Sequence, residues 1–116
     1  MNILKTTEES GIILAEIQIA EANLTRANEL RADLNDLVDQ YKRVVVVDFN
    51  QVEYVDSSFL GALVLSLKYA VANHADIAVV NLARDIRDLF GLIRLDKVFK
   101  IYADKDEAIN QLNIKP

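Results

Sequence analysis

Three consecutive polar residues, Asp56, Ser57 and Ser58, are the strongest candidates for chemistry in this sequence. They follow a strand-like stretch and a polar loop, and they precede a segment of helical composition that begins at Phe59. The first N–H groups of a helix lack partners within the helix, and Asp or Ser side chains can accept hydrogen bonds from them. One interpretation of the tripeptide is therefore a helix cap. A hydroxyl at this place could also accept a phosphate, because the helix dipole and the free N–H groups tolerate negative charge.

Apolar residues close to the tripeptide could add to a binding surface around it. Tyr54 and Phe59 flank the tripeptide and are candidate apolar contacts. The helical segment after it is apolar almost all round, so most of its side chains are expected in the core. Its remaining apolar residues, including Ala62, Leu65 and Tyr69, could border a partner surface.

A catalytic role for Ser57 would require a positioned base. No Gly-x-Ser-x-Gly motif surrounds this serine, and the adjacency of Asp56 in sequence does not orient it as a base. His74 follows the second helical segment and is interpreted as a surface turn residue. The three glycines are isolated, so no glycine-rich phosphate loop exists. We therefore expect a protein that is not an enzyme, with no catalytic residue and no cofactor.

The composition fits one domain that spans all 116 residues, with 52% hydrophobic residues to form its core. A net charge of −5 without a basic stripe argues against direct nucleic-acid binding. The absence of cysteine and the single histidine argue against disulfides and a metal site. The sequence has no secretory signal and no apolar run of the roughly 20 residues that span a bilayer. We expect a complete, cytoplasmic, monomeric chain without membrane insertion.

Strand-like and helical segments alternate along the chain. Residues 44–49 and 77–82 are continuous apolar runs, the pattern of strands covered on both faces. Residues 12–19 are β-rich and could pair with residues 2–7 across a turn at 9–11. Four helices are predicted: from about 23–25 to 41, from 59 to 72, from 84 to 92 with Gly91 as the stop, and from 104 to 112. A last strand is predicted at residues 98–102. This order predicts an α/β fold with helices on a largely parallel or mixed sheet.

The segment from Val52 to Leu63 resembles the phosphoacceptor motif of the anti-sigma factor antagonists of the STAS family, usually Asp-Ser-Ser/Thr-Gly-Leu-Gly. The resemblance continues through residues 83–90, 95–102 and 106–108, and the element order matches from near the N-terminus to Leu112. It implies the STAS fold, a central mixed, mostly parallel sheet with an N-terminal hairpin and four helices. In that family the first serine after the aspartate is phosphorylated by the partner, a serine kinase. The corresponding residue here is Ser57.

Two positions depart from the family motif. Phe59 stands where the family usually has glycine. Asn23 replaces an aspartate that lies near the phosphosite and helps partner recognition in the family. The partner contacts implied by the resemblance and by proximity to the motif are Asn23, Tyr54, Asp56, Ser57, Ser58, Phe59 and Ala62.

The resemblance implies a partner-switching function. The unphosphorylated protein would bind a kinase-type anti-sigma factor and so release the sigma factor, regulating transcription indirectly. Phosphate on Ser57 would abolish binding, and a cognate phosphatase would restore it. Two alternatives remain: an accessory STAS subunit of a membrane transporter for lipids or anions, and a hydrolase that uses Ser57.

Overall fold

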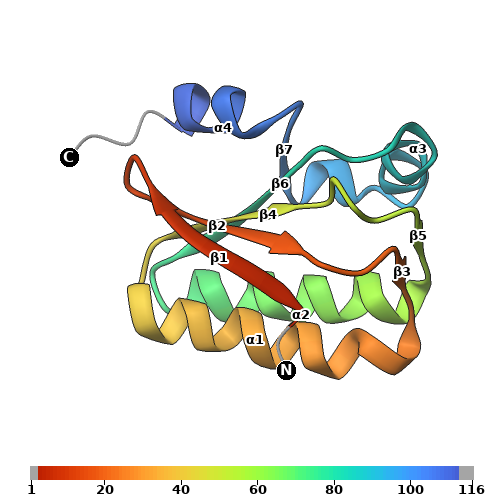
Figure 1. Ribbon diagram of the computed structural model, residues 1–116, viewed down its shortest axis with the longest axis horizontal. Coiled ribbons are helices and arrows are strands. Elements are labelled where there is room, and N and C mark those ends of the chain that lie inside the picture. Colours follow the sequence, from red (N-terminus) through yellow and green to blue (C-terminus); the bar gives the residue numbers. More distant parts are fainter. Residues whose placement is uncertain (1–2, 113–116) are drawn as a thin grey trace.

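The computed structural model describes residues 3–112. Within this range a five-stranded sheet carries α1 and α2 on one face and α4 on the other, while α3 lies at one end (Figure 1). In chain order the elements are β1 (Leu4–Glu9), β2 (Ile12–Ile17), β3 (Glu21–Ala22), α1 (Leu24–Tyr41), β4 (Val44–Asp48), β5 (Tyr54–Val55), α2 (Ser57–Ala72), β6 (Asp76–Val80), α3 (Arg84–Leu92), the 3-10 helix η1 (Leu95–Lys97), β7 (Lys100–Tyr102) and α4 (Lys105–Leu112). The α/β fold predicted from the sequence is confirmed.

The sheet is mixed because its first strand belongs to a hairpin. β1 and β2 are antiparallel, with Leu4 opposite Ile17 and Glu9 opposite Ile12. Ser10 and Gly11 form the turn with φ values of 50° and 85°, the left-handed pair that a two-residue hairpin turn requires. The other strands run parallel, in the order β1-β2-β4-β6-β7. The predicted hairpin is confirmed, although position 2 of its expected first strand lies outside the described residues.

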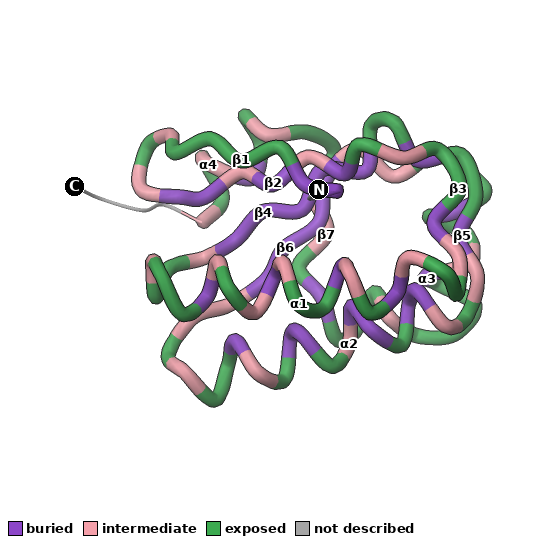
Figure 2. The backbone as a smooth tube through the Cα atoms, turned by 60° about the horizontal axis from the view of Figure 1, so that its bottom comes forward, coloured by how far each residue is buried: buried purple, intermediate pink, exposed green. Residues whose placement is uncertain are grey.

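β4 and β6 are interior strands with both faces covered, as their apolar runs predict. Val45 and Val47 of β4 are 0% exposed and belong to the large core under α1 and α2. Val46, on the opposite face, lies in a smaller cluster with Ala78 of β6 and Ala108 of α4. Figure 2 shows both strands as nearly continuous buried segments. Because both faces of each strand are covered by apolar clusters, its sequence does not alternate between apolar and polar residues.

The predicted bounds of α3, residues 84–92, are confirmed, but the predicted role of Gly91 as its stop is wrong. Gly91 does not stop α3 but remains inside it, and the helix continues through Leu92. Arg94 adopts the left-handed conformation, with φ 64°, and its N–H donates to the Gly91 carbonyl at 3.2 Å. The helix therefore ends one residue beyond the glycine, with Ile93 as its C-cap. The chain then forms η1, which the sequence analysis did not predict because three residues are too few to show a periodic pattern.

Amide hydrogen exchange should identify β4 and β6 as the most protected segments of the chain. Each lies between two other strands and is buried on both faces, so exchange there requires nearly global unfolding. The amides of the edge strand β1 serve as the internal comparison. If Val45 to Val47 exchanged as fast as β1, the placement of the core would be contradicted.

Candidate functional site

Two very short strands bring the candidate site together. β3 and β5 pair in parallel, with Glu21 opposite Tyr54 and Ala22 opposite Val55. They lie side by side at one end of the molecule (Figure 2). The next residue after each strand caps a helix: Asn23 caps α1 and Asp56 caps α2. α1 and α2 therefore start next to each other and run in the same direction (Figure 1).

The carboxylate of Asp56 caps both helices at once. Its Oδ1 accepts a hydrogen bond from the Phe59 N–H at 2.9 Å, within α2. Its Oδ2 accepts from the Leu24 N–H at 2.8 Å, the first residue of α1 and 32 positions earlier in the chain. Each bond satisfies a backbone donor that has no partner inside its own helix. Asp56 is therefore a bridge between the two helix N-termini as well as the first residue of the motif.

Asn23 completes the capping of α1. Its Oδ1 accepts from the Thr25 N–H at 3.1 Å and from the Thr25 hydroxyl at 2.6 Å. The helix start predicted near Asn23 or Thr25 is confirmed. Asparagine is as effective a cap as aspartate, so the departure from the family motif leaves the helix start intact while removing one negative charge beside the site.

Ser57 is exposed at the first position of α2, whereas Ser58 is half-buried at the second. The partial positive charges at the N-termini of α1 and α2 both lie at this end of the molecule. No acidic side chain lies in the first turn of either helix, so Asp56 at the cap is the carboxylate bonded there. The accessible hydroxyl of the pair is thus that of Ser57.

Two residues expected at the surface are in the core. Phe59 is 0% exposed and is among the largest fully buried side chains in the described chain. Ala62, at 8% exposed, is also buried. The expectation of surface contacts through these two side chains is corrected, because positions 59, 62 and 63 lie on the buried face of α2. Phe59 occupies interior space that a glycine side chain would not fill.

Other apolar side chains remain at the surface near the site. Tyr54 is 54% exposed and borders a shallow groove between β5 and α3, whose other walls include Ile86 and Leu89. Leu24, which donates to Asp56, is 67% exposed. Sequence patterns do not single out Leu24 as a surface residue, because its spacing from the buried Ala27 matches the buried stripe of the helix. The site therefore combines an accessible hydroxyl with exposed apolar side chains.

The geometry offers Ser57 no histidine base. His74 lies just beyond the C-terminal end of α2, with φ 64°, as the predicted turn residue. A 16-residue helix is about 24 Å long, so His74 is at the opposite end of α2 from Ser57. Among residues 3–112 there is also no group of three or more His, Asp or Glu side chains suited to a metal ion. No helix within the same range has the length and apolar character to cross a bilayer.

Comparisons with known proteins agree with this fold. The family model described as "Mlab, STAS domain" matches residues 20–102. A STAS-domain containing protein of Pseudomonas aeruginosa (strain UCBPP-PA14) is 33% identical over 72 residues, which cover 57% of this chain and 71% of that protein. BtrV of Bordetella bronchiseptica, named as a candidate anti-sigma factor antagonist, is 24% identical over 98 residues, 84% of each chain. The structure of an anti-sigma-factor antagonist (STAS) domain protein from Planctomyces limnophilus superposes with a TM-score of 0.84 at 18% identity, covering 95% of this chain and 97% of that one. The chain belongs to the STAS domain family.

Proposed function

We propose that this protein is an anti-sigma factor antagonist, which binds an anti-sigma factor at the shared N-terminal end of α1 and α2. The name of the Bordetella relative, aligned over 84% of both chains, supports this function. So does the site, where an accessible serine and exposed apolar side chains lie on one end of the molecule. The protein acts as a ligand and a substrate, as one domain, rather than as a catalyst.

The switch in this proposal is phosphorylation of Ser57 by a kinase-type anti-sigma factor, reversed by a phosphatase. The observation that carries it is the exposure of Ser57 at the start of α2. Ser57 directly follows Asp56, whose carboxylate accepts a hydrogen bond on each oxygen. A phosphate adds a charge of about −1.5 to −2 at neutral pH. The phosphorylated protein would then present two negative groups to the partner, the phosphate and the Asp56 carboxylate, whereas the unphosphorylated protein presents only the carboxylate.

The proposed contact surface consists of the residues around this serine that are not buried. Its members are Asn23, Leu24, Tyr54, Asp56, Ser57 and Ser58. Tyr54 and Leu24 supply apolar area, and the polar members surround the phosphorylation site. Aromatic residues commonly contribute much of the energy of such interfaces. Tyr54 is therefore the proposed apolar anchor.

Phosphate is expected on Ser57 and not on Ser58. Ser57 is exposed, whereas Ser58 is half-buried in the first turn of α2 and less accessible to a kinase. Incubation with the anti-sigma factor kinase and ATP, followed by peptide mass spectrometry, locates the phosphate. Ser58→Ala is the matched control and should be labelled like the wild type, while Ser57→Ala should not be labelled. Equal labelling of Ser57→Ala would contradict the assignment.

A pull-down from the native cell extract tests the partner class. Wild type and Ser57→Asp are compared, and an anti-sigma factor should be retained by the wild type alone. Retention of a transporter subunit by both proteins would instead favour the alternative of an accessory STAS subunit.

A further inference from the structure

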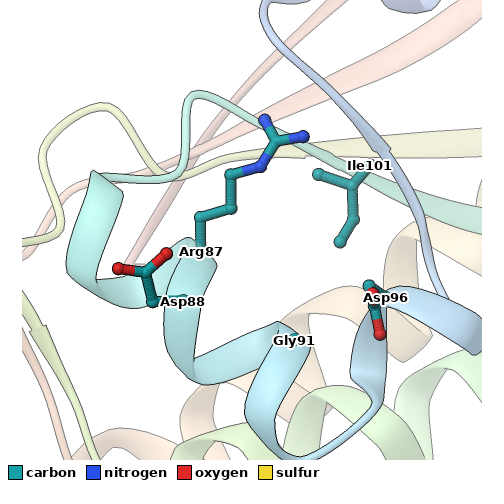
Figure 3. Close-up of a pocket in the computed structure, with 5 residues that line it drawn as sticks. All are labelled: Arg87, Asp88, Gly91, Asp96 and Ile101. Carbon is teal, nitrogen blue, oxygen red and sulfur yellow. The ribbon is translucent and has the colours of Figure 1, made fainter.

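A second candidate site lies on the side of α3 away from the groove beside Tyr54. There a hollow of about 460 Å³ opens between α3, η1 and the edge strand β7 (Figure 3). Its lining consists of Arg87, Asp88, Gly91, Asp96 and Ile101. This volume is within the range of small-molecule sites. None of these residues belongs to the proposed surface around Ser57.

The Arg87 side chain is exposed and forms no ion pair or side-chain hydrogen bond among the described residues. Figure 3 shows it extending from α3 into the hollow toward Ile101, while Asp88 is turned to the other side. Within residues 3–112, no carboxylate lies within salt-bridge distance of its guanidinium. A guanidinium is a planar fork of donors that fits a carboxylate or a phosphate with two hydrogen bonds. Arg87 is therefore available to bind an anionic oxygen group.

Gly91, one turn after Arg87, keeps the hollow open. Glycine is among the least favourable residues inside a helix, and it is usually retained for a positive φ or for lack of space. Neither reason holds here, because Gly91 is in helical conformation and a Cβ added to it would meet no atom within 4 Å. A larger side chain at this position would instead project into the hollow beside Arg87.

The segment that surrounds the hollow is more basic than the rest of the chain. Residues 84–100 contain five of the thirteen basic residues but only three of the eighteen acidic ones. The lining itself holds one basic residue, Arg87, and two acidic ones, Asp88 and Asp96, so attraction of an anion depends on Arg87. Asp96, across the hollow on η1, can accept hydrogen bonds from hydroxyl groups of the same ligand.

We propose that this hollow binds a small polyhydroxylated anion, of the sugar phosphate or sugar acid class. Arg87 binds the phosphate or carboxylate, Asp96 accepts from hydroxyl groups, and Ile101 contacts the carbon skeleton. The bare backbone at Gly91 provides room for the ligand. This binding is independent of the proposed function at Ser57, so either proposal can fail without the other.

Titration of the ¹⁵N-labelled protein with glucose 6-phosphate and with gluconate tests the site. We expect saturable amide shifts confined to residues 84–101 with at least one of the two probes, and which probe binds tighter distinguishes phosphate from carboxylate. Glucose lacks the anion and inorganic phosphate lacks the hydroxyl skeleton, so each should bind at least about tenfold more weakly, the equivalent of one hydrogen-bonded group. Absence of saturable shifts with both sugar anions at about 10 mM, where a millimolar site is mostly occupied, would overturn the proposal.

Two variants separate the ligand site from general surface effects. Arg87→Gln should weaken binding of the better probe at least about tenfold, because it removes the charge and one side of the fork. Gly91→Gln should abolish binding, whereas Gly61→Gln should not, although both glycines are exposed, helical and free of contacts at the added Cβ. Equal binding by Gly91→Gln and Gly61→Gln, or unchanged binding by Arg87→Gln, would show that the hollow is not the site.

Discussion

Substitution of Ser57 by aspartate is expected to weaken binding to the anti-sigma factor at least about thirtyfold, while the free protein stays nearly as stable as wild type. In the free protein the new carboxylate lies at the start of α2, where the helix dipole favours it by roughly 0.3–1 kcal/mol. Repulsion from Asp56 opposes this, so the two effects largely cancel. At the interface, an unpaired charge that must be buried costs about 2–5 kcal/mol, and each 1.4 kcal/mol or so is tenfold in Kd.

Calorimetric titration with the partner and a thermal melt of the free protein measure the two effects separately. Ser57→Asn is the matched control, since it has nearly the size of aspartate without the charge. It should bind markedly more tightly than Ser57→Asp. If wild type, Ser57→Asp and the Ser57-phosphorylated protein bound the anti-sigma factor with equal affinity, Ser57 would have no switching role.

Substitution of Asp56 by alanine should produce the largest loss of stability at the site, about 2–3 kcal/mol. Loss of one N-cap costs about 1 kcal/mol, and a hydrogen bond to a charged group contributes roughly 1.5–3 kcal/mol. Asp56→Ala removes the bonds to both Phe59 and Leu24, so the N-termini of α1 and α2 lose a cap together. For a domain of this size the midpoint of the thermal melt should fall by roughly 8–12 °C.

Asp104 provides the control for this prediction. Its Oδ1 caps α4 through one hydrogen bond, from the Glu107 N–H at 2.8 Å. Asp104→Ala should therefore lower the free energy of unfolding by only about 1 kcal/mol. If the two alanine variants melted at the same temperature, the bond from Asp56 to α1 would contribute nothing to stability.

Most of the fold can be predicted from the hydrophobic patterns of this sequence. The unbroken apolar runs of β4 and β6 predict strands with two covered faces, and both faces are indeed covered. The helical spacing of Leu30, Leu34 and Val38 predicts the buried stripe of α1. These patterns are visible because each repeats over several residues of one element.

The internal geometry of the site has no such pattern. β3 and β5 are two residues long, too short for any periodicity, yet their pairing places Asn23 beside Asp56. The second hydrogen bond of Asp56, to Leu24, depends on that pairing and is invisible in the local sequence. Phe59 was misplaced for a related reason. Its position next to the motif suggests a surface contact, whereas the packing of α2 in the main core directs its side chain inward.

The hydrogen bond between Asp56 and α1 means that no short peptide around the motif contains the whole of the proposed phosphorylation site. A fragment spanning the motif would keep the serine and the local cap, but it would lack the start of α1, which lies 32 residues upstream. A nascent or unfolded chain lacks the same half of the site. A kinase that recognised both helix ends would modify folded molecules only, so phosphorylation in the proposed switch would report the amount of folded protein and not the total amount synthesised.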